Sequence, residues 1–185
     1  EFSYFSRPDS VMEGKSIHQG RVASGRKLYE QSAIEADVVI GVPDSGVPAA
    51  IGYSQASGIP FDSILVKNRY MSRSFIVPSQ EMRERIVNLK LNPILSQIAG
   101  KRIIVIDDSI VRGTTSKRLV KILKDAGAKE IHFRSASPPI IAPCFLGIDT
   151  PDKSQLISAN MSLEELKNFM DVDSIDFLNI ENLKE

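Results

Sequence analysis

Residues 103–116 combine an apolar strand, two carboxylates and a turn rich in small hydroxyl residues. Asp107 and Asp108 close the strand, and the turn leads into a helical pattern. Backbone N–H groups at a helix start, freed by Gly113, form a concave anion site, and hydroxyl side chains add donors. Paired carboxylates accept hydrogen bonds from vicinal sugar hydroxyls or organise the water shell of Mg²⁺. The segment therefore suits a phosphate monoester at one end and a ribose at the other.

A plainer interpretation of the same segment needs no ligand. Two acidic residues can simply close a strand while Thr114 or Thr115 caps the helix that follows. An acidic pair after a strand also fits the pocket of a receiver-type phosphoacceptor domain. The complete run of fourteen residues is more specific than either alternative and favours the phosphate and ribose site.

Two further polar segments follow predicted strands. Residues 43–46, Pro-Asp-Ser-Gly, form a tight turn, which could also be an ordinary helix start capped by Ser45. The stretch from Lys67 to Val87 contains four arginines and interrupts the regular pattern of helices and strands, which predicts a long functional loop or lid. The alternative is a solvated basic loop, and we prefer surface positions for Arg83 and Arg85.

The elements that position these segments alternate along the chain. Short Val- and Ile-rich strands are predicted at 37–42, 63–67, 102–107 and 130–136, and a two-faced strand at 87–92. Helices are predicted at 46–57, after the third strand with its end at Gly127, and from Ser162 onward. Strand, tight loop, helix and strand predict an α/β fold with a parallel sheet. Ligands in such folds bind beyond the carboxyl ends of the strands.

Bulk properties limit the class of protein. The chain has 185 residues, 42% of them hydrophobic, which predicts one domain. Its 23 basic and 23 acidic residues cancel, so we expect neither a nucleic acid nor a membrane surface as partner. The apolar runs are short and no leader pattern opens the chain, which predicts a cytoplasmic protein. Glu1 replaces an initiator methionine and leads into a predicted strand at 2–5, so the chain is expected to be excised from a longer one.

Residues 103–116 closely resemble the substrate-binding motif of the type I phosphoribosyltransferases. Other stretches extend the resemblance over essentially the whole chain and make it similar to the glutamine-dependent amidotransferase branch, namely 4–10, 41–46, 67–70, 89–93 and 137–139. The resemblance implies the type I phosphoribosyltransferase fold, a parallel sheet flanked by helices. It also implies a small hood formed from about 1–12 and 137–185, and a glutaminase domain that is absent from this chain.

The same resemblance implies a role for each site residue. Asp107 and Asp108 would bind ribose hydroxyls and hydrated Mg²⁺, and Ser45 would contact the metal. The diphosphate loop would be Pro43, Asp44, Ser45 and Gly46, often with a non-proline cis peptide. The flexible catalytic loop would carry Lys67, Arg69 and Arg73 and would be mobile until substrate binds. The 5-phosphate would be cradled by Ser109, Ile110, Val111, Arg112, Gly113, Thr114, Thr115 and Ser116.

The implied reaction joins ammonia to C1 of phosphoribosyl diphosphate, releases diphosphate, and opens purine synthesis. It requires no general base, so His18 and His132 are expected to be structural. The resemblance further implies inhibition by AMP and GMP and a homo-oligomeric parent enzyme. The single cysteine, Cys144, is a buried apolar residue by default. Its position matches a ligand of the 4Fe–4S cluster in one branch of the family, and such a cluster needs four thiolates.

Two alternatives to this enzyme remain open from the sequence. A regulator that senses phosphoribosyl diphosphate would keep the pocket without chemistry, and would typically carry a helix-turn-helix or a basic RNA-binding face. A base-salvage phosphoribosyltransferase would need a hood that holds a purine or pyrimidine.

Overall fold

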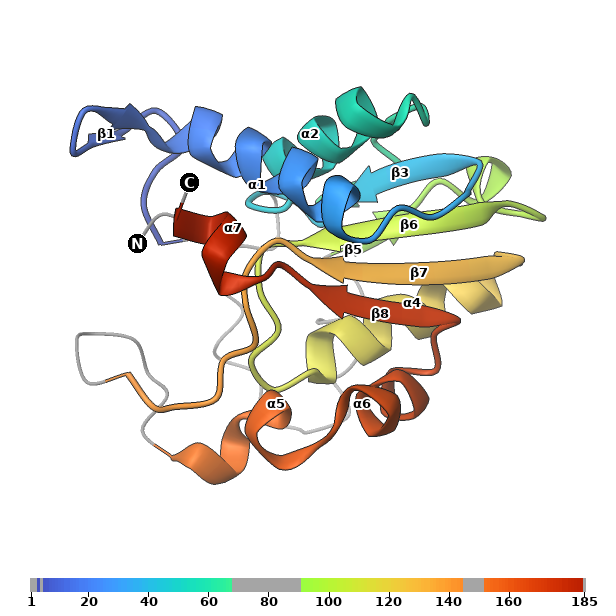
Figure 1. Ribbon diagram of the computed structural model, residues 1–185. Coiled ribbons are helices and arrows are strands. Elements are labelled where there is room, and N and C mark those ends of the chain that lie inside the picture. Colours follow the sequence, from blue (N-terminus) through green and yellow to red (C-terminus); the bar gives the residue numbers. More distant parts are fainter. Residues whose placement is uncertain (1–2, 4, 68–90, 145–151, 185) are drawn as a thin grey trace, which may run out of the picture.

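The computed structural model describes residues 3, 5–67, 91–144 and 152–184. At its centre lies a four-stranded parallel sheet with the order β3 (Val38–Gly41), β6 (Arg102–Asp107), β7 (Glu130–Ser135) and β8 (Ser174–Phe177). One face is covered by α1 (Ile17–Gln31) and α2 (Val47–Ser57), the other by α4 (Thr114–Asp125) and α6 (Leu163–Met170), as Figure 1 shows. The predicted α/β class is confirmed.

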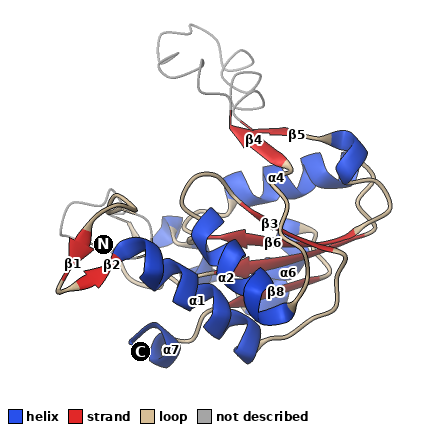
Figure 2. Cartoon of the chain, turned by 90° about the horizontal axis from the view of Figure 1, so that it is seen from above, coloured by secondary structure: helices blue, strands red, loops and turns tan. Residues whose placement is uncertain are grey.

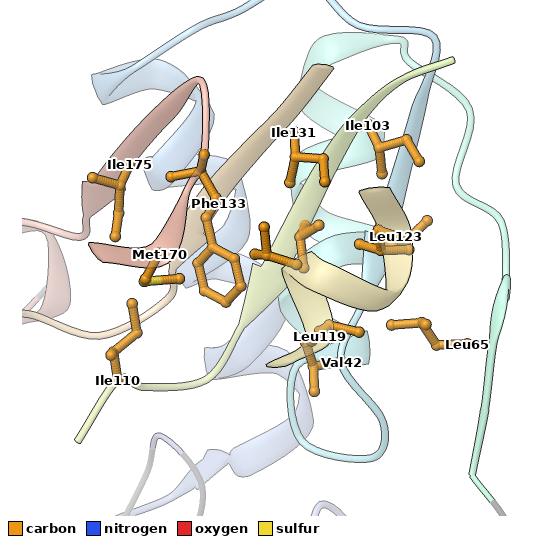
Figure 3. Packing of buried hydrophobic residues seen from close by; sticks show 14 of the residues in the cluster. Val42, Leu65, Ile103, Ile110, Leu119, Leu123, Ile131, Phe133, Met170 and Ile175 are labelled. Atoms are coloured by element: carbon orange, nitrogen blue, oxygen red, sulfur yellow. The ribbon is translucent and has the colours of Figure 1, made fainter. Parts of the chain in front are cut away.

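The central strands are apolar on both faces because helices cover both. Ile103 and Val105 of β6 face the core beneath α4 and α6, whereas Ile104 and Ile106 face the core beneath α1 and α2. In the first of these cores Phe133 lies beside Met170 (Figure 3). This two-sided burial explains why the strands at 37–42, 102–107 and 130–136 could be recognised as continuous apolar runs.

The predicted helix ends agree with the structure. Helix α2 carries Pro48 in its first turn and ends at Gly58, whose φ of 74° is the left-handed conformation that favours glycine. Helix α4 ends just before Gly127, which also has a positive φ. The helix predicted from Ser162 is α6, and Ser162 and Glu165 form a capping box at its start.

The predicted strand at 63–67 exists, but it does not join the parallel sheet. Strand β4 (Leu65–Lys67) pairs antiparallel with β5 (Leu91–Pro93), and a short helical turn η2 (Leu95–Gln97) follows. Figure 2 shows this pair at the edge of the molecule, beside α4. Only Leu65 of β4 is buried, whereas an inner strand of a parallel sheet is buried on both faces. Of the strand predicted at 87–92, residues 87–90 lie outside the described part.

The fourth parallel strand is β8, which the sequence analysis had placed in the hood. Its side chains alternate, with Ile175 and Phe177 buried, and it pairs with β7 at the sheet edge. The preceding helices α5 (Ile157–Asn160) and α6 also contribute residues to the core, whereas the short helical turn η3 (Lys153–Gln155) before them is not buried. Much of the C-terminal region therefore contributes to the sheet and its core. A last helix, α7 (Ile180–Lys184), follows β8 and packs on α1.

The N-terminal region differs from its prediction. Phe5 lies in a turn and not in a strand, while residues 2 and 4 lie outside the described part. The first regular elements are a hairpin of β1 (Val11–Met12) and β2 (Lys15–Ser16), which leads into α1. Helix α1 was not predicted. Its buried residues have helical spacing, but two of them, Arg21 and Gly25, are not the large apolar residues that mark an amphipathic helix.

Glycines allow α1 and α2 to pack in backbone contact. A β-carbon on Gly25 would overlap the carbonyl oxygen of Ala49, and one on Gly52 would overlap that of Val22. The two helices therefore approach each other as closely as backbones can. This contact fixes α2, whose first residue follows directly after the turn at 43–46.

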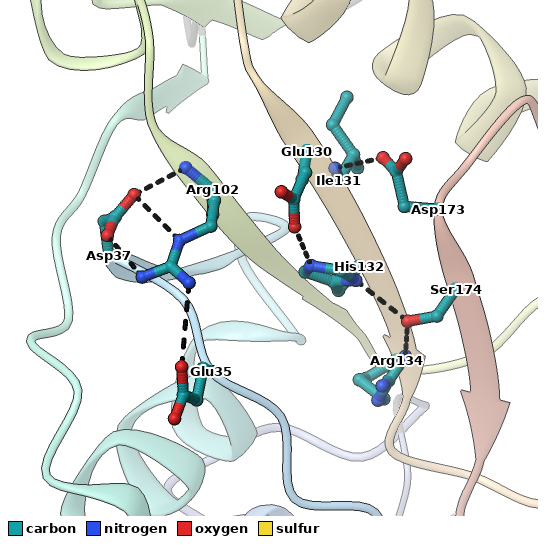
Figure 4. A network of polar contacts seen from close by, with 9 residues as sticks. All are labelled: Glu35, Asp37, Arg102, Glu130, Ile131, His132, Arg134, Asp173 and Ser174. Carbon is teal, nitrogen blue, oxygen red and sulfur yellow. Dashed lines mark hydrogen bonds and ion pairs between the residues drawn. The ribbon is translucent and has the colours of Figure 1, made fainter.

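Polar side chains on and beside the strands of the parallel sheet connect neighbouring strands (Figure 4). Arg102 pairs with Asp37 at 3.0 Å, joining β6 to the residue before β3. His132 lies 3.2 Å from Glu130 and 3.0 Å from Ser174, and Arg134 also donates to Ser174. The contacts to Ser174, the first residue of β8, hold β8 to β7. Among the described residues, every helix is too short or too polar to cross a membrane.

Candidate substrate-binding site

The two predicted ligand loops leave neighbouring strands. Strands β3 and β6 are paired with Gly41 opposite Ile106, and the N–H of Val42 donates to the Ile106 carbonyl at 2.8 Å. A β-carbon on Gly46 would lie 2.6 Å from the same carbonyl oxygen. Only glycine permits this approach. The turn at 43–46 therefore lies against the end of β6, next to the acidic pair.

The turn at 43–46 has the features that the resemblance implies. The peptide bond between Pro43 and Asp44 is cis. Helix α2 starts at Gly46 as its N-cap, without a side-chain capping bond, so Ser45 does not cap the helix as the plainer interpretation supposed. Ser45 instead lines a cavity together with Asp108.

The two carboxylates of the acidic pair differ in their surroundings. Asp107 retains some exposed surface as a residue, but its carboxyl group lies deep and accepts a 2.9 Å hydrogen bond from the Asp108 N–H. Burial raises the pKa of Asp107 to about 8, and the charge of Asp108 acts in the same direction. Asp108 accepts a hydrogen bond from the Ser109 hydroxyl at 2.9 Å. An additional cation here would favour the charged form of Asp107.

These residues fit a magnesium ion only as part of its ligand set. In the described part of the chain, no group of three or more acidic, histidine or cysteine side chains could hold a metal. Asp107, Asp108 and Ser45 offer oxygen ligands, which Mg²⁺ prefers. Because this set is incomplete, water and substrate oxygens would have to supply the remaining positions.

Residues 109–116 form a loop that leads into α4. Gly113, at φ 72°, is the residue before the helix, and the first turn of α4 contains no acidic side chain, which leaves the positive end of its dipole available to an anion. Thr114 and Thr115 are exposed. Three other predicted members differ in the surroundings of their side chains. Ile110 is buried in the core, Ser116 is buried at the helix start, and Arg112 donates to Gln155.

Lys67 reaches the turn at 43–46. Its Nζ lies 2.6 Å from Asp44 Oδ2, so the end of β4 is joined to that turn by an ion pair. Arg69 and Arg73, the other predicted catalytic cations, lie outside the described residues, as does most of the predicted mobile loop.

A cavity of about 710 Å³ adjoins the site and contains a residue that the sequence analysis missed. Ser45 and Asp108 line it, together with Arg21 of α1. Arg21 is only 5% exposed and donates to the Ser6 carbonyl at 2.8 Å. Burial lowers the pKa of Arg21, while the negative charge of Asp108 acts in the opposite direction. An arginine within an unpredicted helix gave no signal in the sequence.

Cys144 and the two histidines are not part of these loops in the sequence. Cys144 is half-buried at the end of a described stretch, and as the single cysteine of the chain it cannot complete a four-thiolate cluster. His18 is exposed on α1, and His132 belongs to the network between β7 and β8. The geometry thus places two turns, each leading into a helix, beside a carboxylate pair.

Strand-to-helix loops at the carboxyl ends of adjacent parallel strands are where α/β proteins typically bind their ligands. The family model of the phosphoribosyl transferase domain matches residues 17–136, and the chain belongs to this family. It is 53% identical over 185 residues to the amidophosphoribosyltransferase of Methanothermobacter thermautotrophicus and 50% identical over 183 residues to that of Bacillus subtilis. Amidophosphoribosyltransferase 1, chloroplastic, of Arabidopsis thaliana is 50% identical over 185 residues.

A solved structure supports the same relationship. The glutamine phosphoribosylpyrophosphate amidotransferase from B. subtilis, complexed with ADP and GMP, superimposes with a TM-score of 0.90 at 50% identity over 98% of this chain. The chain covers 40% of that structure, and 39%, 38% and 33% of the three sequence relatives. It therefore spans well under half the length of the proteins it matches.

Proposed function

We propose that this chain transfers the phosphoribosyl group of phosphoribosyl diphosphate to ammonia, forming 5-phosphoribosylamine and diphosphate. The C1–O bond to diphosphate breaks, a C1–N bond forms, and the nitrogen loses a proton to solvent. The observation that carries the proposal is the identity of 50–53% with amidophosphoribosyltransferases along the whole chain. The placement of the two anion loops on adjacent strands supports it.

Each loop then has one part of the substrate to bind. Backbone N–H groups of 109–116, with the hydroxyls of Thr114 and Thr115, would hold the 5-phosphate at the start of α4. The turn at 43–46 would face the diphosphate. Asp107 and Asp108 lie between them, where they would accept hydrogen bonds from the ribose hydroxyls.

Catalysis in this proposal is positioning and electrostatics, because ammonia needs no activation by a base. Lys67, Arg69 and Arg73 would offset the charge that grows on the departing diphosphate and exclude water from C1. For Lys67 the support is its contact with Asp44 of the diphosphate turn. Bound Mg²⁺ would supply positive charge to the diphosphate oxygens. Asp107, Asp108 and Ser45 would hold it together with water and substrate oxygens.

The longer relatives suggest what the remainder of the parent protein does. We propose that a glutaminase domain supplies ammonia from glutamine, that the parent is a homo-oligomer, and that Cys144 is one of four thiolates where a 4Fe–4S cluster is present. The hood would comprise residues 1–12 and the parts of 137–185 outside the sheet. The B. subtilis structure holds ADP and GMP. We accordingly propose that purine nucleotides inhibit by placing their monophosphate in the 109–116 loop.

A product assay tests the proposal against its rivals. The purified chain is supplied with phosphoribosyl diphosphate, Mg²⁺ and, in separate reactions, ammonium chloride at high pH, adenine, guanine, hypoxanthine or uracil, and released diphosphate is measured. Release with ammonia alone supports the proposal. Release with a free base would instead identify a salvage enzyme, and binding without any release would identify a sensor.

A further inference from the structure

The loop at 109–113 is shaped by a segment far from it in sequence. The carbonyl of Val111 accepts a 2.9 Å hydrogen bond from the N–H of Ile157. A β-carbon on Gly113 would lie 2.6 Å from Ile157 Cδ1, so the Ile157 side chain packs directly against the loop backbone. Arg112 Nε and Nη2 both donate to Gln155 Oε1, at 3.0 and 2.6 Å. Three consecutive loop residues are thus held by Gln155 and Ile157.

The segment that holds the loop is itself firmly fixed. Asn160 Nδ2 lies within hydrogen-bond distance of three carbonyl oxygens, those of Lys153, Ser154 and Leu156, at 2.7–3.3 Å. Asp152 accepts from the Ser154 N–H at 2.8 Å and caps η3. Leu156 and Ile157 are buried. A segment tied internally and anchored in the core can impose a conformation on the loop beside it.

The contact between Gln155 and Arg112 also decides where a guanidinium lies. Arg112 adjoins Gly113, so its side chain could otherwise reach a phosphate at the start of α4 or compete for the loop carbonyls. With both donors on one amide oxygen, it is directed toward η3. The guanidinium then does not compete for the loop carbonyls.

From these contacts we infer that Gln155 is a positioning residue, which acts through Arg112 to hold the loop at 109–113 in the conformation that receives the 5-phosphate. This inference rests on the proposed function. Gln155 is exposed, so its substitution does not open the core. Arg112 and Gln155 are separated by 43 positions in the sequence, which explains why the loop motif alone did not reveal Gln155.

Two probes separate the loop from the rest of the site in a calorimetric test. Ribose 5-phosphate carries the 5-phosphate, whereas magnesium diphosphate should occupy the turn at 43–46. Gln155→Ala should weaken ribose 5-phosphate about tenfold, the loss expected when a hydrogen bond to a charged group no longer holds its partner. Diphosphate affinity and melting temperature should stay unchanged. Gln155→Glu keeps an acceptor for Arg112 and should restore affinity to within about twofold of wild type.

A matched control and a double variant complete the test. Gln97 is another exposed glutamine whose Oε1 accepts from a cation, Lys101, and Gln97→Ala should bind both probes as wild type does. Arg112→Ala should add no further loss in the Gln155→Ala background if the two act as one unit. Unchanged ribose 5-phosphate affinity in Gln155→Ala, or equal weakening of both probes, would overturn the inference. A wild-type chain that binds neither probe would overturn the proposed function and this inference with it.

Discussion

Lys67 Nζ and Asp44 Oδ2 lie 2.6 Å apart, which joins the cation at the end of β4 to the acidic residue of the turn at 43–46. The turn is proposed to receive diphosphate, and an unpaired carboxylate there would repel it. Lys67 therefore offsets a charge of the protein itself before any substrate is bound. Since both side chains are about half exposed, the pair should contribute about 1 kcal/mol or less to stability.

The ion pair predicts a specific pattern of diphosphate affinity. Asp44→Asn should bind magnesium diphosphate a few-fold more tightly, because one repulsive charge is removed. Lys67→Ala should bind it a few-fold more weakly, because Asp44 is left unpaired. If Lys67 acts mainly through Asp44, the double variant should return close to the wild-type affinity, as a double-mutant cycle measured by calorimetry would reveal.

The control for this cycle is Lys121→Ala. Lys121 pairs with Asp125 on the exposed surface of α4, within one helix and with no part in the turn. It removes the same charge from the molecule and should leave diphosphate affinity unchanged. Additive losses in the cycle would mean that Lys67 contacts diphosphate independently of Asp44.

The acidic pair predicts a loss of binding without a loss of folding. Asp107→Asn together with Asp108→Asn should weaken magnesium phosphoribosyl diphosphate by about a hundredfold or more, because two hydrogen bonds to charged groups are lost. The fold should persist, since the neutral amide suits the deep position in which burial raises the pKa of Asp107 to about 8. Calorimetry and circular dichroism on the same sample measure both. Wild-type affinity in the double variant would remove this pair from the substrate site.

Two glycines of α1 form a matched test of the helix contact that fixes α2. Gly25→Ala should destabilise the fold by about 1–3 kcal/mol, because its β-carbon overlaps the Ala49 carbonyl. Gly20→Ala, in the same helix but with open space around its position, should stabilise by up to about 1 kcal/mol. Thermal melts should therefore shift in opposite directions, by about 2–4 °C per kcal/mol. Equal shifts would show that the close contact does not limit stability.

The ligand loops could be predicted from the sequence because each is a continuous motif. Residues 103–116 contain their strand, acidic pair, glycine turn and helix start in a single run, so local chemistry determines the element. The same holds for the turn at 43–46. Strand pairing could not be predicted in this way. The runs at 63–67 and 102–107 look alike locally, and only the long-range contacts place one outside the sheet and the other at its centre.

Contacts between distant residues account for what the sequence did not reveal. The role of Arg112 depends on Gln155, and that of Lys67 depends on Asp44. Helix α1 buries an arginine and a glycine, because it packs against the α2 backbone and beside Asp108. No periodic pattern of large apolar residues could indicate such a face.

His132 predicts a pH dependence of stability. The residue is only 6% exposed, and burial lowers the pKa of His132. The positive charge of Arg134 also lowers this pKa, whereas Glu130 and Asp173 raise it. In the unfolded chain the ring takes up a proton near its ordinary pKa of about 6.5, so below that pH the unfolded state binds more protons than the folded state. Stability should fall as pH drops below about 6.5, by at most about 1.4 kcal/mol per pH unit.

Urea unfolding at several pH values between 5 and 8 measures this dependence. His132→Gln lacks the titrating ring and should show a smaller loss of unfolding free energy at low pH, whatever its stability at pH 8. His18→Gln, on the exposed face of α1, is the control. An identical pH dependence in wild type and His132→Gln would contradict the prediction.

The chain alone should use ammonia but not glutamine as its nitrogen source. Release of ammonia from an amide needs an activated nucleophile, usually a thiol or hydroxyl beside a base. The one cysteine of the chain is Cys144, and of its two histidines His132 is engaged by Glu130 and Ser174 while His18 is exposed on α1. His132 is therefore not placed to act as the base that would activate the Cys144 thiol. The residues proposed to bind phosphoribosyl diphosphate, in contrast, all lie within this chain.

Diphosphate release measures the difference directly. The purified chain, with Mg²⁺ and phosphoribosyl diphosphate, is given either glutamine at neutral pH or ammonium chloride at high pH, where a larger fraction is the reactive free base. Release with ammonium should exceed the hydrolysis blank, and release with glutamine should equal it. Cys144→Ala should leave the ammonium reaction intact, because ammonia attacks C1 without help from a thiol. Glutamine-dependent turnover that disappears in Cys144→Ala would instead identify Cys144 as a nucleophile. It would contradict the proposal that a separate glutaminase domain releases ammonia from glutamine.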